Sequence, residues 1–175
     1  MDSSEFLEFL VSRCSVREYD ARKIPGADLT FILDCASTAP SAGNLEAWDV
    51  VVVEGEEAQE RMAEAAYGQE HVAKASLLLV VCANYVRSMS RYGDRGVLFA
   101  IEDATIACTY MMLAAHARRL HTCWVGSFQD EEVRQLLELP SHARPVAILC
   151  IGVGASPGSY TERMPVVEHM HYQSW

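Results

Sequence analysis

Three short segments of the chain are almost entirely apolar, and they set the expected architecture. Residues 49–54, 76–83 and 146–153 are rich in Val, Ile and Leu. Runs of this length and composition predict β-strands that are covered on both faces. Amphipathic segments separate them, and their hydrophobic spacing predicts helices at about 4–11, 27–38, 56–67, 96–120 and 130–137. Because strands alternate with helices, we expect an α/β or α+β layered sheet.

Other regions have weaker patterns. Residues 84–96 are polar and contain several Arg and Tyr side chains, so we expect a long loop of the kind that is often functional. Residues 122–126 form a short extended segment, and residues 156–175 are expected to form an irregular tail. The helix at 96–120 is apolar on more than one face, which predicts a central position or a subunit interface.

Length and charge restrict the function classes. A chain of 175 residues is most simply one domain spanning 1–175, and 50% hydrophobic residues suffice for a real core. The formal net charge of −10 argues against a surface for nucleic acid or an anionic membrane. A protein this acidic needs a few local cations wherever it binds a phosphate group.

The cysteines and the N-terminus indicate the compartment. Six cysteines occur without a Cys-x-x-Cys pair, and several lie within apolar runs. This distribution predicts reduced, buried thiols in a cytoplasmic protein, with neither a disulfide framework nor a zinc site. The first five residues show no signal-peptide pattern. No apolar run reaches the ~18 residues that a membrane span requires, so we expect no membrane association.

The first candidate site is the stretch from Ser12 to Tyr19. It places Arg13 and Arg17 four residues apart, with the hydroxyl of Ser15 between them. A guanidinium group binds phosphate oxygens in a planar, bidentate manner, and a hydroxyl adds a donor. A solvated basic helix end has the same composition, since Arg stabilises the C-terminal helix dipole. Taken alone, the stretch favours the solvated helix end.

A second stretch, residues 39–48, shifts the balance toward a binding site. It carries Pro40, Ser41 and Asn44 between a predicted helix and a predicted strand. Together the two stretches resemble the FMN-dependent nitroreductase family, which has Arg-Arg-Ser-x-Arg near the N-terminus and Pro-Ser-x-x-Asn-x-Gln-Pro-Trp further on. The resemblance covers nearly all of the chain and indicates a short-chain member. Outside that family, the second stretch would serve equally well as a helix stop and an N-cap.

The resemblance implies an architecture and an assembly. It implies an α+β, three-layer nitroreductase-like fold with a central β-sheet flanked by helices. It also implies an intertwined homodimer, because the family builds each FMN site from both subunits. The helix at 96–120 would form the core of the interface, and the tail at about 156–175 would extend over the partner subunit.

The resemblance further implies which residues bind the phosphate of FMN. Arg13, Ser15 and Arg163 would hold it, with Cys14 at the position where the family has a second Arg. Arg17 would lie near the ribityl chain and the pyrimidine edge, where a fixed cation favours hydride uptake by the flavin. Because Cys14 replaces an Arg and Arg163 has no second adjacent cation, we expect weaker FMN binding than is usual for the family.

Other residues would surround the flavin ring according to the same resemblance. Pro40, Ser41 and Asn44 would reach it from the partner subunit, although residues 46–47 are Glu-Ala where the family has Gln-Pro. The segment under the ring would be Trp124, Val125 and Gly126, with a backbone N–H near Gly126 at the flavin N5. Core packing is an alternative for Trp124. Gln69 matches a ring-contacting residue of some members.

The implied reaction is carried by the cofactor. NAD(P)H would transfer a hydride to FMN and leave, and a nitroaromatic or quinone-type acceptor would take its place in a ping-pong cycle. No catalytic acid or base is required of the protein. Two alternatives stay open: an FMN enzyme of the same fold with other redox chemistry (a dehydrogenase, a deiodinase-like or a flavin-fragmenting enzyme), and a non-catalytic flavin or nucleotide binder. No residue clearly addresses a 2′-phosphate, so the sequence favours neither NADH nor NADPH.

Other site classes lack support in the sequence. Residues 152–158 contain Gly-x-Gly, but Pro157 takes the third glycine position of a dinucleotide loop and a tail follows. Neither His116 and His121 nor the two tail histidines have Cys or carboxylate partners at metal-ligand spacing. No Gly-x-Ser-x-Gly elbow of a serine hydrolase occurs.

Overall fold

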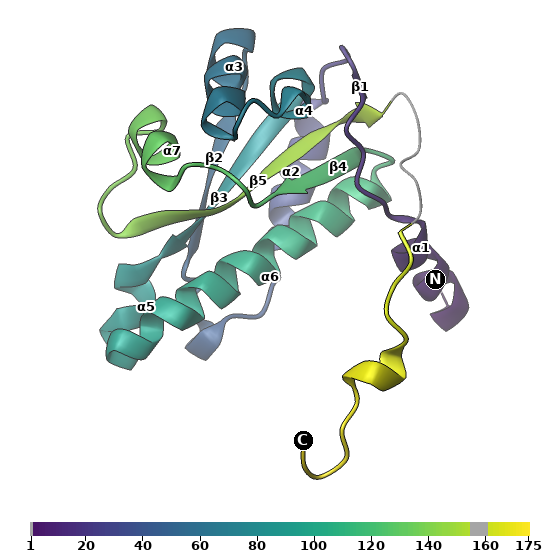
Figure 1. The fold of residues 1–175 in the computed structure, drawn as a ribbon, viewed down its shortest axis with the longest axis vertical. Helices are drawn as coiled ribbons and strands as arrows, with labels where there is room; N and C mark the ends of the chain where they lie inside the picture. Colours follow the sequence, from purple (N-terminus) through teal and green to yellow (C-terminus); the bar gives the residue numbers. More distant parts are fainter. Residues whose placement is uncertain (1, 155–160) are drawn as a thin grey trace.

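A central antiparallel β-sheet forms the middle of the protein (Figure 1). The structure is a computed structural model and describes residues 2–154 and 161–175. The five strands of the sheet are β1 (Tyr19–Asp20), β2 (Trp48–Val53), β3 (Leu77–Asn84), β4 (His121–Val125) and β5 (Ala143–Gly154). β5 is the central strand, because it pairs with β1, β3 and β4, while β2 pairs with β3. In this register Val80 of β3 lies opposite both Ile148 of β5 and Val51 of β2.

The predicted strands are present, but they differ in burial. Every residue of β3 is buried, and β5 is buried over most of its length, as their apolar runs predicted. The expectation that the first strand is covered on both faces is wrong, because β2 lies at the edge of the sheet and Val52 is 39% exposed. A Val-rich run has the same composition at an edge as in the interior, so the sequence could not distinguish the two.

Helices cover both faces of the sheet, which confirms the α+β layered fold (Figure 1). They are α1 (Ser3–Ser12), α2 (Gly26–Ala36), α3 (Glu56–Ala65), α4 (Glu70–Lys74), α5 (Tyr85–Tyr92), α6 (Gly96–Ala117) and α7 (Asp130–Leu136). On one face α2 and α6 bury Ile32 and Met111 against Leu149 of β5. On the other face α3, α4 and α7 enclose a second core that contains Met62 and Val72. Sequence periodicity did not predict the short elements α4 and β1.

The longest helix, α6, occupies the central position that its composition predicted. Nine of its residues are buried, among them Ala104, Ala107 and Met111. By length and composition alone, the helical stretch Tyr85–Ala117 could cross a membrane, a candidate that the sequence analysis did not anticipate. Its second part, α6, packs against α2 and against β2, β3, β4 and β5, so it is the core helix of this fold.

The expected loop at 84–96 is wrong, because most of it is the helix α5. The side chain of Asn84 caps this helix by accepting a hydrogen bond from the backbone N–H of Arg87 at 3.2 Å. A single 3-10 turn, Gly93–Arg95, separates α5 from α6. Gly96 allows the start of α6 to lie against α5, since a Cβ atom there would lie only 2.6 Å from the backbone nitrogen of Met89. The polar composition of this segment did not predict a helix. Only Ser88 of α5 is buried, so the helix needs almost no apolar stripe to pack against the core.

All six cysteines are free thiols, as their spacing predicted. Four of them are buried, while Cys14 and Cys35 are partly exposed, so the expectation of uniform burial holds only in part. Burial raises the pKa of Cys82 to about 12 and also raises the pKa of Cys108, which keeps both thiols protonated. A cytoplasmic location stays a prediction.

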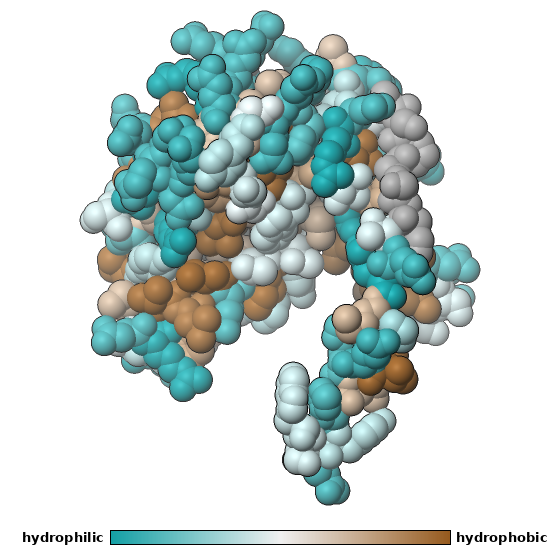
Figure 2. Space-filling model, in the orientation of Figure 1, coloured by the Kyte–Doolittle hydropathy of each residue, from teal (hydrophilic) through white to brown (hydrophobic). Residues whose placement is uncertain are grey.

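The two ends of the chain stand apart from this core. α1 has no buried residue, and residues 161–175 of the tail are all exposed, including the short helix Val166–His169 (Figures 1 and 2). Both ends carry exposed large hydrophobic side chains: Phe6, Leu7, Leu10 and Val11 on α1, and Met164, Val166, Val167, Met170, Tyr172 and Trp175 on the tail. Residues 156–160 of the predicted tail lie outside the described residues.

Candidate functional site

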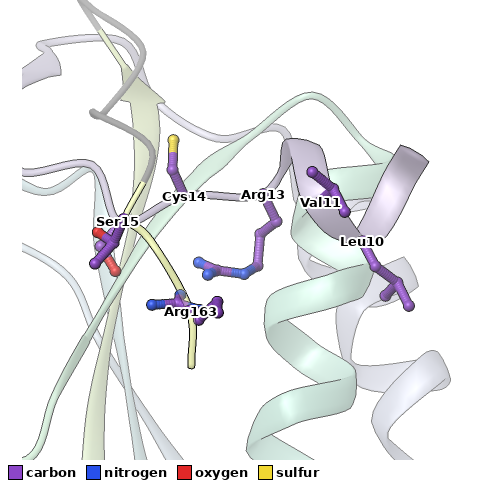
Figure 3. A pocket seen from close by; sticks show the side chains of 7 residues that line it. Leu10, Val11, Arg13, Cys14, Ser15 and Arg163 are labelled. Carbon is purple, nitrogen blue, oxygen red and sulfur yellow. The ribbon is translucent and has the colours of Figure 1, made fainter. Parts of the chain in front are cut away.

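The structure brings the two ends of the chain together at one pocket of about 250 Å³. Arg13, Cys14 and Ser15 line it from the segment after α1, and Arg163 lines it from the tail (Figure 3). The pocket also includes Thr161, whose hydroxyl the sequence analysis did not single out. Residues predicted to share a phosphate site, although far apart in the sequence, therefore do share a pocket.

The pocket is rich in unpaired positive charge. Within the described part of the chain, neither Arg13 nor Arg163 forms an ion pair or a side-chain hydrogen bond. Two guanidinium groups beside one cavity repel each other unless an anion lies between them. Ser15 adds a hydroxyl donor and acceptor. This donor set suits a dianionic phosphate, which offers several acceptor oxygens.

Two contacts fix the segment that carries Arg13. At its start, the hydroxyl of Ser12 and the Nε2 atom of His116 are 2.8 Å apart, and the rings of Phe9 and His116 lie 4.8 Å apart between centroids. At its end, the buried residue Val16 donates its backbone N–H to the carbonyl oxygen of Thr122 at 2.9 Å. The segment is thus anchored to the C-terminal part of α6 and to β4.

Arg17 follows on the exposed side of this anchor, and its charge reaches two buried groups. Burial raises the pKa of the Cys123 thiol, and the positive charges of Arg17 and Arg13 partly oppose that rise. Burial lowers the pKa of His71 in α4, and the charge of Arg17 lowers it further. Arg17 therefore lies near both β4 and α4, beyond the pocket of Arg13.

Gln69, directly before α4, contacts the segment that follows β4. Its Nε2 atom donates to the carbonyl oxygens of Ala66 and Ser127, both at 2.9 Å. Both amide hydrogens are used in this way, which leaves only the side-chain oxygen to accept a hydrogen bond from a ligand. Gln69 and the segment Trp124–Gly126 are thus neighbours, as the prediction of a shared site requires.

The segment Trp124–Gly126 continues β4 to the surface. Val125 is buried and Gly126 is exposed, so the backbone leaves the core at this point. Trp124 is half-buried and packs against the core that α6 covers, which supports its alternative role in core packing. A Cβ atom at Gly126 would meet the indole Nε1 of Trp124 at 3.4 Å, an ordinary contact distance, so the indole lies directly beside Gly126.

The loop with Pro40, Ser41 and Asn44 is held by a carboxylate that the sequence analysis missed. Asp103 on α6 is 2% exposed. Its oxygens accept the backbone N–H groups of Ala42 at 2.8 Å and Ala47 at 3.1 Å. The available signal was an acidic pair, Glu102 and Asp103, within a helix of mostly small apolar residues. Of two adjacent helical positions one can face the core, and a buried carboxylate requires partners.

Helix α5 holds the same loop from the other side. Arg87 donates from Nη1 to the carbonyl oxygens of Glu46 and Trp48, each at 2.8 Å, and Arg91 donates to the carbonyl oxygen of Gly43 at 3.3 Å. Gly43, Asn44 and Glu46 all have left-handed φ values, at 59°, 58° and 47°. A backbone of this kind persists only where its surroundings fix it.

Within one protomer, this loop lies away from the arginine pocket. Asp103 holds the loop, whereas His116 holds the segment before Arg13. The rise of 1.5 Å per residue places these two anchors about 20 Å apart along α6. The structure therefore brings together Arg13, Cys14, Ser15 and Arg163, and separately Gln69 and the segment Trp124–Gly126, but it keeps the loop apart.

One buried histidine near the site was also missed. His71 is 8% exposed, and its Nε2 atom is enclosed without a hydrogen-bond partner. A buried polar atom without a partner is uncommon, which makes His71 a candidate for binding a ligand. Among the described residues, no group of three or more His, Cys, Asp or Glu side chains could hold a metal ion.

Comparison with known proteins gives a consistent result. Residues 10–78 and 65–153 match the model of the Nitroreductase family. An NADH dehydrogenase of Thermus thermophilus is 29% identical over 89% of this chain and 90% of its own length. An FMN reductase [NAD(P)H] of Bacillus subtilis is 26% identical over 98% of this chain and 75% of its own length. The structure of B. megaterium NfrA2 superimposes with a TM-score of 0.91 at 24% identity, covering 100% of this chain and 76% of the other.

Proposed function

We propose, since the chain belongs to the nitroreductase family, that it binds FMN and uses NAD(P)H to reduce nitroaromatic or quinone-type acceptors. Membership of this family makes the chain an oxidoreductase, as its motifs predicted. One observation carries the cofactor assignment. Arg13 and Arg163, from opposite ends of the chain, line a single pocket without an ion-pair partner among the described residues. The name of the B. subtilis relative, an FMN reductase [NAD(P)H], supports the same choice of cofactor and reductant.

The residues around the pocket fit the parts of FMN. Arg13, Ser15, Thr161 and Arg163 would bind the phosphate through charge-assisted hydrogen bonds. Arg17 would lie further along, toward the ribityl chain and the pyrimidine edge. Its charge would stabilise the negative charge that the pyrimidine edge gains on reduction, which raises the reduction potential.

The segment Trp124–Gly126 would support the flat ring. Here the half-buried indole of Trp124 supplies an apolar surface, and Gln69 is bonded to Ser127, which directly follows the same segment. Bound FMN would supply the hydride transfer, so the protein's task is to bind, orient and tune it. Since neither nicotinamide is selected by a recognisable residue, both NADH and NADPH are the candidates to be assayed.

We further propose a homodimer in which the loop with Ser41 and Asn44 serves the site of the partner subunit. The loop is rigidly held, yet it lies about 20 Å along α6 from the anchor of the arginine pocket. α1 and the tail expose large hydrophobic side chains that a partner subunit would cover. Leu98 and Tyr110 on α6 are exposed as well.

The cofactor proposal is tested by titrating apo-protein with FMN and following the flavin fluorescence. The wild type should bind FMN, whereas Arg13→Ala should raise the Kd by about 10- to 100-fold, because a hydrogen bond to a charged group contributes about 1.5–3 kcal/mol. Arg22→Ala is the matched control, since Arg22 pairs with Asp20 at the surface. Equal affinities for wild type and Arg13→Ala would place the phosphate elsewhere.

The reaction itself is tested with the FMN-loaded protein. Oxidation of NADH or NADPH in the presence of a nitroaromatic or quinone acceptor supports the proposal. Flavin reduction without transfer to these acceptors would favour another redox enzyme of the same fold. No flavin reduction by either nicotinamide would favour a non-catalytic flavin binder.

A further inference from the structure

His71 is exceptional among the buried polar side chains of the described residues. Its Nε2 atom lacks a hydrogen-bond partner, a condition that only Ser88 Oγ shares within the described chain. Desolvating an imidazole nitrogen without a partner costs stability, so such atoms are rare in native proteins. The neighbouring residue Val72 is fully buried in the core beneath α4 and holds this short helix in place.

The position of His71 connects it with the proposed cofactor site. It lies two residues after Gln69, whose amide is bonded to Ser127 next to Gly126. The charge of Arg17 lies close enough to add to the lowering of the pKa of His71 that burial causes. His71 thus neighbours the two groups that would lie at the polar side of the flavin ring.

The protonation state of His71 suits a directed hydrogen bond. Burial lowers its pKa, and the positive charge of Arg17 lowers the pKa further, so the ring is neutral at neutral pH. A neutral imidazole has one N–H donor and one nitrogen acceptor. It can therefore hydrogen-bond beside Arg17 without placing a second positive charge there.

We propose that His71 is a cofactor-binding residue, whose ring nitrogen hydrogen-bonds to the pyrimidine edge of the flavin next to Arg17. The proposal rests on the proposed function of this site. The pyrimidine edge carries carbonyl acceptors and an N–H donor, so it can satisfy either imidazole tautomer. Because Nε2 is enclosed, binding requires the ring to turn about its Cβ–Cγ bond, and side-chain rotations of this kind commonly accompany binding.

A residue kept for a ligand behaves differently from one that fills the core. Replacing His71 by Leu removes an unpaired polar group while keeping apolar volume. The apo-protein should then keep or raise its Tm, whereas FMN should bind more weakly. A core-filling histidine would show the reverse: a lower Tm on replacement, with no specific change in FMN affinity.

The test compares His71→Leu, His71→Asn and the wild type by FMN titration of apo-protein and by the Tm without FMN. We expect the Kd to rise about 2- to 10-fold in His71→Leu, the loss of one hydrogen bond, at an unchanged or higher Tm. His71→Asn, which keeps a donor and an acceptor, should recover most of the affinity. Ser88→Ala, which removes the other unpaired polar atom, is the matched control and should leave the affinity for FMN unchanged.

The outcomes separate this inference from the proposed function. If His71→Leu binds FMN as tightly as the wild type while Arg13→Ala binds it more weakly, the role of His71 is wrong and the proposed function stands. A Kd that follows the loss of Tm in both His71 variants would also overturn it, since His71 would then be structural. A wild type that does not bind FMN would overturn the proposed function itself.

Discussion

The two parts of the candidate site are built in opposite ways. The loop at 40–47 is fixed by a buried carboxylate on one side and by arginines of α5 on the other. The arginine pocket lies between α1, which buries no residue, and a tail that is fully exposed. The loop is therefore preorganised by its own protomer, whereas the pocket has one anchored wall, the segment that carries Arg13, and one exposed wall, the tail.

This difference indicates how the site would be completed. A loop that its own protomer already fixes can act as a rigid element for another subunit. A pocket with two unpaired guanidinium groups gains stability only when an anion binds, and a partner subunit would cover its hydrophobic walls. We therefore expect the pocket, and not the loop, to respond most strongly to cofactor and dimer formation.

The largest expected effect comes from mixing two defective subunits. Arg13→Ala damages the pocket, and Asn44→Gly removes a loop side chain without straining its left-handed backbone. A mixed dimer would contain one site with both changes and one site with neither. Co-expressed chains with two different tags should therefore recover bound FMN, measured by absorbance after purification through both tags.

Two differently tagged Arg13→Ala chains are the control for that experiment, and they should bind no more FMN than the Arg13→Ala homodimer. If the mixture of Arg13→Ala and Asn44→Gly also stays empty, the loop serves its own subunit and the proposed sharing is wrong.

A smaller effect is expected from removing the carboxylate that fixes the loop. Asp103→Ala leaves the backbone N–H groups of Ala42 and Ala47 without their acceptors. At about 1–3 kcal/mol for each of the two buried unpaired groups, the free energy of unfolding should fall by about 2–6 kcal/mol. Urea denaturation measures this change, and Asp103→Asn, which keeps one acceptor oxygen, should lose less. Equal stability of all three proteins would show that the loop is held by α5 alone.

The smallest effect is a dependence of stability on pH. Burial lowers the pKa of His71 and of His116 from the ordinary value of 6.5, so the folded protein binds fewer protons than the unfolded chain. Stability is therefore fully present above about pH 6.5 and falls as the pH drops through the lowered folded-state pKa values. The slope of unfolding free energy between pH 7 and pH 5 should decrease in His116→Gln, and an identical slope would exclude His116 as a source.

Much of the fold and site followed from local patterns in the sequence. The buried strands β3 and β5 and the core helix α6 were readable because their apolar runs are long and continuous. The two motifs with Arg13 and Asn44 indicated the family because each combines several residue types at fixed spacing.

The missed features depend on tertiary contacts. α5 is a helix because Asn84 caps it and Gly96 allows its close turn, not because of an apolar stripe. The edge position of β2 follows from strand order, which composition does not contain. Asp103 and His71 gain significance only from the loop and the charge that folding places beside them.

The most direct test of the account compares the affinities of apo-protein for FMN and for riboflavin, which lacks the phosphate. If Arg13 and Arg163 bind the phosphate, the wild type should bind FMN at least about 100-fold more tightly than riboflavin. The double variant Arg13→Ala/Arg163→Ala should bind the two ligands almost equally, with the affinity for riboflavin unchanged. A double variant that retains the wild-type preference for FMN would contradict the assignment of this pocket.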